Sequence, residues 1–568
     1  MAGSKHIDKI CVAVLVLSLL LTVLFVNGER LGIGKIVDED AEANAGSAYF
    51  TANDLDGGWD ASNATRITLD GGAAAGGGAY FYNGDLIISG AGRYALSGTL
   101  DGGSIIVNAE NAKVWLLLDG VTVNCPDDAC LRVDEADKVF LTLAEGTENS
   151  FTSGESYSET ALADGTGGAI FAHDDLTING GGSLSVAAGY KHGIDANDEL
   201  VITGGTVSVT APQDGVHVND GFRLCNASLT IAAGDDGVHS DTSVYIESGT
   251  VQIDECYEGI EAPAIDIAGG DITIYPADDG INASDGSSGS MFGGLGKFGG
   301  GRDFSRFDGG GMQGGDFDAE GPRFSGSDGE VPDLPGASAP NGEIPDLPGA
   351  FVPDGEAPTL PDAFAPDGEA AEPNAPGADD SGKTDEELYI RISGGTITII
   401  NENARDADGI DSNGSIYITG GSIRISMSNG GYALDVGSES GGVMEISGGD
   451  IVACGSYAMA ESFDSSSTQP SILYTYSAGA PAGATVALED MDGNVLINYT
   501  APCAFSCVNL SCPEMKLGET YRVVIGDNVE EITLSEVSAS YGDVQGGGFG
   551  GMRPRGGFMG GRGGRPGA

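Results

Sequence analysis

Acidic residues recur beside glycine at a nearly constant interval in the middle of the chain. Glycines followed by Ile or Val lie 22, 22, 22 and 21 residues apart, at Gly193, Gly215, Gly237, Gly259 and Gly280. The residues that precede these and a later glycine are mostly carboxylates: His192, Asp214, Asp236, Glu258, Asp279 and Asp408. Two positions after the glycines stand Asp195, His217, His239, Glu261, Asn282 and Asp411. Calcium (Ca2+) takes carboxylate and amide oxygens as ligands, so this spacing predicts a series of calcium-binding positions.

Carboxylates that stack on one another need a counter-ion. At the spacing of paired strands, about 4.8 Å, two bare carboxylates repel by about 1 kcal/mol in water and about 3–4 kcal/mol at an effective dielectric constant of 20. A calcium ion with oxygen ligands at about 2.3–2.6 Å would bridge that spacing. The preferred ligands are Asp235, Asp236, Asp278 and Asp279, then Asp406 and Asp408, with Asp195, Asp214, Glu258 and Asp411 completing the set. Because Asp-Gly is also a common turn dipeptide, solvated acidic turns are the alternative.

The segments between the glycines predict the fold that would position these acids. Each period contains short runs in which apolar and polar residues alternate around Gly-Gly, as in residues 200–209 and 265–274. Such alternation, with β-branched residues and glycine corners, indicates strands and tight turns. A 22-residue unit is too short to bury its own core, whereas stacked units share one. We therefore predict an all-β chain folded as a right-handed parallel β-helix.

Changes in composition divide the rest of the chain. Residues 286–385 interrupt the period and are rich in Gly, Pro and acids, which bury too little apolar surface to fold. The last ordered segment has a hairpin signal at Asp492-Gly493 and predicts a small antiparallel C-terminal cap. The predicted divisions are an N-terminal anchor or signal segment (1–28), a linker and cap region (29–79), the β-helix in two parts (80–285 and 386–470), the disordered insertion (286–385), the C-terminal β cap (471–541) and a disordered Gly/Arg-rich tail (542–568).

The charge balance narrows the possible partners. The 568 residues include 85 Asp and Glu against 25 Lys and Arg, a formal net charge of −60. This charge would repel a phosphate backbone, so we expect no nucleic acid partner and a need for cations. Five His and nine Cys, without CxxC or HExxH spacing, give little basis for a structural zinc site.

An apolar stretch near the N-terminus predicts the cellular location. Residues 10–26 are apolar apart from Ser18 and Thr22, with Lys5 and Lys9 before them and acidic residues after them. This order of charges places the N-terminus inside the cell and the remaining chain outside. We expect the protein on the extracellular face of the cell membrane, as a monomer anchored by this helix. The alternative is a cleaved signal segment and a secreted protein.

Aromatic residues are sparse. Trp115 lies in the apolar run 114–118 and is expected in the core. Candidates for an exposed sugar-binding face are Tyr190, Tyr257, Tyr389, Tyr417 and Tyr432.

Several segments together resemble a known family. The run 278–283 (DDGINA), the ITGGTV unit at 202–207, the QPSIL segment at 469–473 and the Gly-rich tail resemble the bacterial carbohydrate-binding β-helix family of clostridial surfaces, which has a pectate-lyase-like fold. The resemblance covers roughly residues 80–286 and 386–540. It implies binding of polygalacturonate and, as a second candidate, cellulose, with calcium held between turns and without established catalysis.

Three functional hypotheses follow. The first is a surface-displayed, non-catalytic, calcium-dependent binder of acidic plant polysaccharide. The second is a calcium-dependent pectate lyase, whose β-elimination needs a base beside the metal; Arg405, next to Asp406 and Asp408, is the candidate. The third is a structural adhesin or spacer that binds no glycan.

Overall fold

The structure, a computed structural model, describes residues 49–58, 61–70, 76–285 and 388–543. The predicted anchor at residues 10–26, the insertion at 286–385 and the tail beyond residue 543 lie outside these ranges. Within them, no helix is long and apolar enough to cross a membrane.

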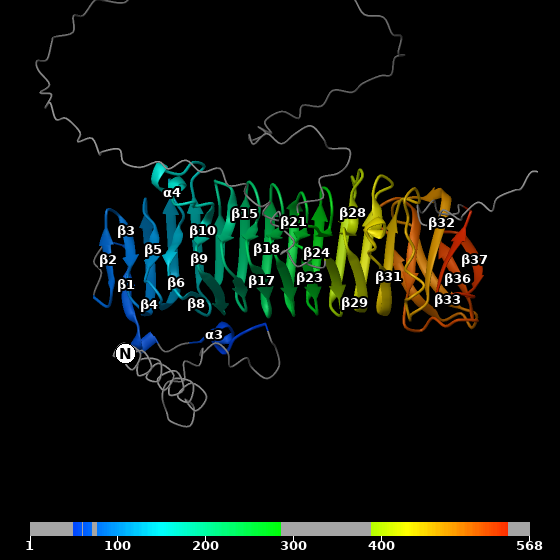
Figure 1. The fold of residues 1–568 in the computed structure, drawn as a ribbon, viewed down its shortest axis with the longest axis horizontal. Helices are drawn as coiled ribbons and strands as arrows, with labels where there is room; N and C mark the ends of the chain where they lie inside the picture. Colours follow the sequence, from blue (N-terminus) through cyan, green and yellow to red (C-terminus); the bar gives the residue numbers. More distant parts are fainter. Residues whose placement is uncertain (1–48, 59–60, 71–75, 286–387, 544–568) are drawn as a thin grey trace, which may run out of the picture. The chain divides into compact units, whose positions relative to one another are not determined.

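The described chain forms a parallel β-solenoid, which confirms the predicted fold class (Figure 1). Its turns contribute strands to three faces. The first, called here the column face, is a 12-stranded sheet. Its strands, in order, are β2 (Ala79–Tyr82), β3 (Asp85–Ile88), β5 (Ile105–Asn108), β7 (Leu131–Glu135), β10 (Gly168–Ala172), β13 (His192–Ala196), β16 (Val216–Val218), β19 (Val238–Ser240), β22 (Ile260–Glu261), β25 (Ile281–Ala283), β28 (Asp408–Ser412) and β30 (Tyr432–Val436).

The other two faces belong to one 22-stranded sheet. The second face, called the strap face, contains β1 (Thr65–Thr68), β8 (Lys138–Leu143), β11 (Asp175–Gly180), β14 (Leu200–Ile202), β17 (Gly221–Leu224), β20 (Ser243–Ile246), β23 (Ala264–Ile267) and β26 (Tyr389–Ile392). The third, called the hydroxyl face, contains β9 (Glu148–Ser153), β12 (Ser183–Ala187), β15 (Thr206–Ala211), β18 (Ala227–Ala233), β21 (Gly249–Cys256), β24 (Asp271–Pro276) and β27 (Thr396–Asn401). Long strands run through both faces: β4 (Gly92–Asp101), β6 (Lys113–Cys125), β29 (Ser415–Met427) and β31 (Met444–Gly455).

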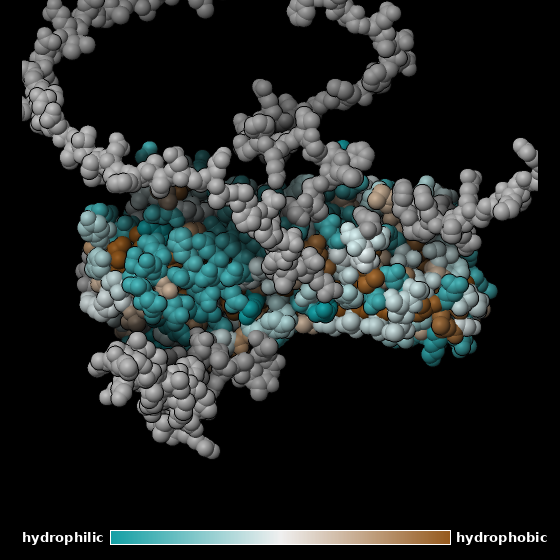
Figure 2. Space-filling view, viewed as in Figure 1, coloured by the Kyte–Doolittle hydropathy of each residue, from teal (hydrophilic) through white to brown (hydrophobic). Residues whose placement is uncertain are grey.

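The ladder of parallel pairs continues on both sides of residues 286–387. Strand β23 pairs with β26, and β25 pairs with β28. The core follows from the alternation along each strand: in β18, Leu229 and Ile231 are buried while the residues beside them are partly exposed. Hydrophilic residues gather over the N-terminal half of the solenoid in the view of Figure 2.

The regularly spaced glycines are required by the close approach of successive turns. A Cβ atom at residue 237 would lie 2.5 Å from the carbonyl oxygen of Gly259 and 2.7 Å from Ile253 Cδ1. At residue 215 it would lie 2.4 Å from Ile231 Cγ2. These distances are shorter than van der Waals contact, so the packing of each turn on the next selects glycine at this position.

An N-terminal segment lies along the strap face. It contains the short helix α3 (Ala52–Leu55), where Asp54 is 1% exposed. The Asp54 carboxylate accepts a hydrogen bond from Thr177 and lies 3.0 Å from the Lys138 ammonium. Further along, the ring of Tyr49 stacks on Tyr245 with centroids 3.8 Å apart. Strands far apart in sequence are therefore joined by this segment, which we call the strap (residues 49–58). The other short helical elements are η2 (Ala61–Asn63), α4 (Glu159–Ala163) and η3 (Ser438–Ser440).

Antiparallel strands follow the last turn, as predicted. Strand β35 (Phe505–Ser511) pairs antiparallel with β31 and with β32 (Ser471–Ala480), and β38 (Ser538–Gly542) lies beside β32. A separate four-stranded antiparallel sheet contains β33 (Thr485–Asp490), β34 (Val495–Thr500), β36 (Thr520–Ile525) and β37 (Asn528–Thr533). The hairpin between β33 and β34 turns at Asp492-Gly493, which confirms that prediction. The eight cysteines of the described ranges are buried and unpaired.

The prediction for Trp115 was wrong. In β6, Val114 and Leu116 point into the core, and Trp115 faces outward, half-buried. Its indole stacks on Phe140 with centroids 5.1 Å apart, and the Arg93 guanidinium lies 4.7 Å from the indole centroid. The consecutive apolar residues of this run conceal the alternation in the sequence, since an outward position that a neighbouring phenylalanine covers can also be apolar.

Candidate metal centre

Two rows of side chains run along the column face, and the solenoid register aligns them. The first row consists of the residues that precede the regularly spaced glycines. The backbone N–H of each of these glycines donates to the backbone carbonyl of the first-row residue one turn later, for example Gly215 to Asp236 at 2.9 Å. In the second row, the paired positions run without a gap from β13 to β28. We call these twelve residues the acidic column: His192, Asp214, Asp236, Glu258, Asp279 and Asp408 in the first row, and Asp195, His217, His239, Glu261, Asn282 and Asp411 in the second.

Three aspartates converge near the far end of the column. Asp279, Asp408 and Asp411 each offer a carboxylate oxygen, and these oxygens lie within 4.8 Å of one another. The backbone N–H of Asp408 donates to Asp279 Oδ1 at 2.6 Å. Burial, reinforced by the charge of Asp279, raises the pKa of Asp408 to about 10. Burial also raises the pKa of Asp279 to about 7. The protein alone therefore supplies too little positive charge for this group, called the aspartate cluster.

A neighbouring amide adds an oxygen that the protein leaves without a donor. Asn282 is 7% exposed, and its Nδ2 donates to Glu258 Oε2 at 3.0 Å. Within the described ranges, Asn282 Oδ1 and Asp408 Oδ1 are buried and have no hydrogen-bond partner. Buried oxygens are normally paired with a donor or an ion. The donor set here is oxygen alone, and therefore fits a hard cation such as calcium.

A second all-oxygen group lies two turns earlier. The carboxylates of Asp214, Asp235 and Asp236 also come within 4.8 Å of one another, and the Asp236 N–H donates to Asp214 Oδ1 at 3.2 Å. Asp236 is buried, whereas Asp235 is exposed. Between the two groups, burial and then the charge of Glu261 raise the pKa of Glu258 to about 9. Asp195, at the start of the second row, is buried and its pKa is raised by that burial.

Some predicted site residues lie outside both groups. Asp278 is half-buried; its pKa is raised by burial, against a hydrogen bond with Tyr257. Asp406 is exposed and adopts a positive φ of 57°. Arg405, the candidate base, is exposed in the turn before β28. The structure thus brings together Asp279 with Asp408 and Asp411, and Asp214 with Asp235 and Asp236.

Sequence reasoning gave the histidines no role, although the structure places three of them among these acids. The His192 and His217 rings stack with centroids 4.4 Å apart, and His217 and His239 with centroids 5.0 Å apart. Their position in the repeat could have identified them, because each histidine occupies a place that other turns fill with an oxygen ligand. Burial acts to raise the pKa of Asp214, but the nearby His192 imidazole and the hydrogen bond with His217 outweigh it and lower this pKa.

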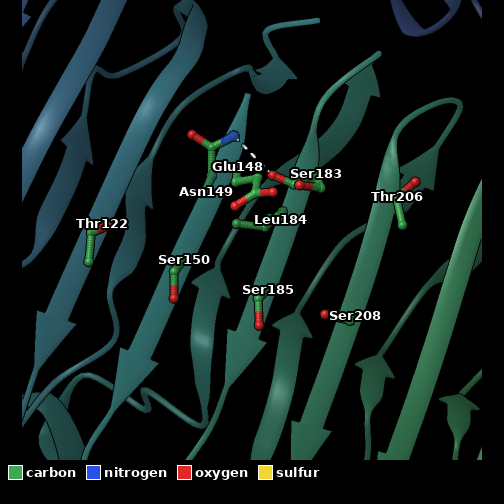
Figure 3. A pocket seen from close by; sticks show the side chains of 9 residues that line it. All are labelled: Thr122, Glu148, Asn149, Ser150, Ser183, Leu184, Ser185, Thr206 and Ser208. Carbon is green, nitrogen blue, oxygen red and sulfur yellow. Dashed lines mark hydrogen bonds between the residues drawn. The ribbon is translucent and has the colours of Figure 1, made fainter. Parts of the chain in front are cut away.

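The hydroxyl face carries a pocket. A pocket of about 380 Å³ lies across β6, β9, β12 and β15, where short polar side chains point outward (Figure 3). Asn149 Nδ2 donates to the Ser183 carbonyl at 3.0 Å at its edge. The pocket is lined by Thr122, Glu148, Asn149, Ser150, Ser183, Leu184, Ser185, Thr206 and Ser208. Of the tyrosines considered for an exposed face, Tyr257 is exposed and the other four are half-buried.

A family model and a relative of known description each match part of this chain. The family model described as "Carbohydrate-binding domain-containing protein" matches residues 82–291, which include the acidic column from His192 to Asn282. Over these residues the chain is similar to carbohydrate-binding-domain proteins. A protein of that description from Acetivibrio thermocellus is 36% identical over 126 residues, 22% of this chain and 44% of the relative. This chain thus spans less than half the length of that relative.

A solved structure was also found. It is described as a polysaccharide lyase-like protein from C. thermocellum, in a gadolinium derivative. The alignment has 27% sequence identity and a TM-score of 0.33, and it covers 37% of this chain and 93% of that chain.

Proposed function

We propose that this protein binds an acidic plant polysaccharide, such as polygalacturonate, through calcium ions held on the acidic column. The proposal depends on one coincidence: the segment matched by the carbohydrate-binding family model carries most of a column of carboxylates whose oxygens converge in groups that could hold a metal ion. The resemblance to calcium-containing carbohydrate-binding β-helix proteins supports the same function.

Calcium would supply an attraction that the protein lacks. With a net charge of −60 the chain repels a polyanion, and the column adds a local concentration of negative charge. Calcium takes six to eight oxygen ligands. Asp279, Asp408 and Asp411, with the Asn282 amide oxygen, would leave coordination positions for uronate carboxylates or water. The ion would then be a bridge between protein and glycan, and the protein would need no catalytic group.

We further propose that the protein works outside the cell. Residues 10–26 would anchor a monomer to the membrane, or would be cleaved to release it. Either route brings the column to the plant polysaccharide.

Binding of the full-length chain to polygalacturonate tests this function. Co-sedimentation or calorimetry in millimolar calcium should give saturable binding, and excess EDTA should abolish it. The double variant Asp279→Asn, Asp408→Asn should lose at least tenfold in affinity. Asp271→Asn is the matched control, because Asp271 is an exposed aspartate on the hydroxyl face of an adjacent turn.

Two results would contradict the proposal. One is equal binding of polygalacturonate in calcium and in EDTA. The other is release of unsaturated uronate products, detected by their ultraviolet absorbance and lost in Arg405→Ala, which would indicate a lyase instead.

A further inference from the structure

The column changes its donor chemistry along its length. The aspartate cluster offers oxygen alone, whereas nitrogen donors enter at the turns that carry His192, His217 and His239. His217 and His239 occupy paired positions on adjacent strands, so their rings stack almost parallel, at 5°. His192 comes from the first row and stacks on His217 at 23°. Three imidazoles on consecutive turns therefore form a stack that lies beside the carboxylates of the column.

One group of donors converges closely enough to hold a single ion. Asp214 Oδ2 lies 3.0 Å from His192 Nδ1 and 2.9 Å from His217 Nδ1. The other oxygen of this carboxylate accepts the Asp236 backbone N–H, which fixes its orientation. The Asp214 side chain is 8% exposed, and that of His217 is 26% exposed. The three donor atoms are thus largely buried, and one of the histidines reaches solvent.

The donor set disfavours calcium and suits a borderline metal. Calcium takes oxygen ligands, whereas imidazole nitrogen combined with a carboxylate is a usual ligand set for Zn2+. Zinc binds histidine nitrogen at about 2.0–2.1 Å and carboxylate oxygen at about 2.0–2.2 Å, so neighbouring ligands of a tetrahedral ion lie about 3.3–3.5 Å apart. The two short separations at Asp214 are within about half an ångström of that value. Small side-chain movements would therefore open the site.

We propose that His192, Asp214 and His217 form a Zn2+ site, separate from the aspartate cluster. The site shares Asp214 with the group that contains Asp235 and Asp236. Three protein ligands leave the fourth position of a tetrahedral ion open to water or to a ligand carboxylate. A second group, Asp236, His239 and Glu261, has a similar arrangement one turn further, with His239 Nδ1 3.1 Å and 2.9 Å from the two carboxylates. With one nitrogen and two oxygens it is the weaker zinc ligand set of the two.

The absence of a local zinc motif is consistent with this geometry. HExxH and CxxC bring ligands together within one helix or loop, whereas the solenoid brings together residues from two successive turns. His192, Asp214 and His217 are separated by 22 and 3 residues, the first of which is the repeat length. A search for short spacings does not detect such a site.

Metal titration of the full-length chain, prepared without a histidine tag, tests the proposal. Co2+ serves as a spectroscopic probe and Zn2+ as its competitor, both in millimolar calcium. We expect the visible absorption of tetrahedral Co2+ to develop, to be removed by one equivalent of Zn2+, and to persist in calcium. His217→Ala should weaken zinc binding at least tenfold, and His217→Gln provides a variant closer in size.

Two variants serve as controls. His173→Ala removes a histidine that contacts Asn197 and belongs to neither group, so zinc affinity should be unchanged. Asp408→Asn should weaken the calcium response while zinc binding remains, which separates this site from the proposed calcium function. The proposal would be overturned if millimolar calcium displaced the zinc, or if both His217 variants bound zinc with wild-type affinity.

Discussion

Replacing Asp408 with asparagine should stabilise the calcium-free protein, and by more at pH 7 than at pH 5. Asp408 is largely buried beside Asp279 and Asp411, and its pKa is raised to about 10. An aspartate in the unfolded chain has a pKa of about 3.9. Between pH 5 and pH 7 the unfolded chain has therefore released this proton and the folded protein retains it. Because the folded state binds more protons, the free energy of unfolding falls as the pH rises.

The size of the effect follows from the two pH units. Each pH unit lowers the free energy of unfolding of the wild type by about 1.36 kcal/mol, as long as Asp408 stays protonated in the folded state. Asparagine keeps the shape of the side chain and has no proton to lose in this range. The stability advantage of Asp408→Asn over the wild type should thus be greater at pH 7 than at pH 5 by about 2–3 kcal/mol. Any packing change caused by the amide is present at both pH values and cancels in this comparison.

Urea unfolding in EDTA at the two pH values measures this difference, with Asp271→Asn as the exposed control. Saturating calcium should reverse the order at pH 7, because the ion stabilises only the wild-type cluster. An equal difference between variant and wild type at pH 5 and pH 7 would show that Asp408 is already ionised in the folded protein. The electrostatic basis of the aspartate cluster would then be incorrect.

Three further changes test the fold and its ions. Gly237→Ala should destabilise the solenoid by about 1–3 kcal/mol, seen as a lower melting temperature, because its Cβ would meet the Gly259 carbonyl at 2.5 Å; an unchanged melt would contradict the tight packing of turns. Asp54→Ala should cost about 3–5 kcal/mol, because the buried Lys138 would lose the carboxylate 3.0 Å away and keep the more distant Asp175 at 3.9 Å; limited proteolysis should then cut the strap earlier than in the wild type. Calcium should raise the melting temperature of the wild type and EDTA should lower it, and identical melts would argue against bound ions.

The fold could be predicted because one constraint acts on every turn. Each glycine of the series lies under the next turn, as Gly215 and Gly237 show, so the repeat length is visible in the sequence. The same regularity made the two rows of ligands predictable, since residues at equal places in the period face each other across the strands. Asp279, Asp408 and Asp411 come together for this reason, although Asp279 and Asp408 are 129 residues apart.

Other features depend on contacts that do not recur from one turn of the solenoid to the next. The strap brings Asp54 against Lys138 and Thr177, and nothing in the spacing of these residues indicates that they meet. Trp115 faces outward by the alternation along its strand, and it is half-buried there because Phe140 and Arg93, on neighbouring turns, cover its indole. Asp406 precedes the cluster by only two residues, yet its positive φ places it in an exposed turn.

The way the solenoid ends affects how copies of this protein meet. A stack of parallel strands could in principle add the first turn of a second copy to its last turn and grow into a fibre. Here the first strand of the column face, β2, runs antiparallel to β3. An incoming turn would find a strand of reversed polarity at that edge and could not continue the parallel ladder. At the other end, β35 already pairs antiparallel with β31, so the edge of the last turn that a second copy would need is occupied. Antiparallel pairing next to the first and last turns thus opposes the end-to-end polymerisation that the repeated sequence would otherwise favour.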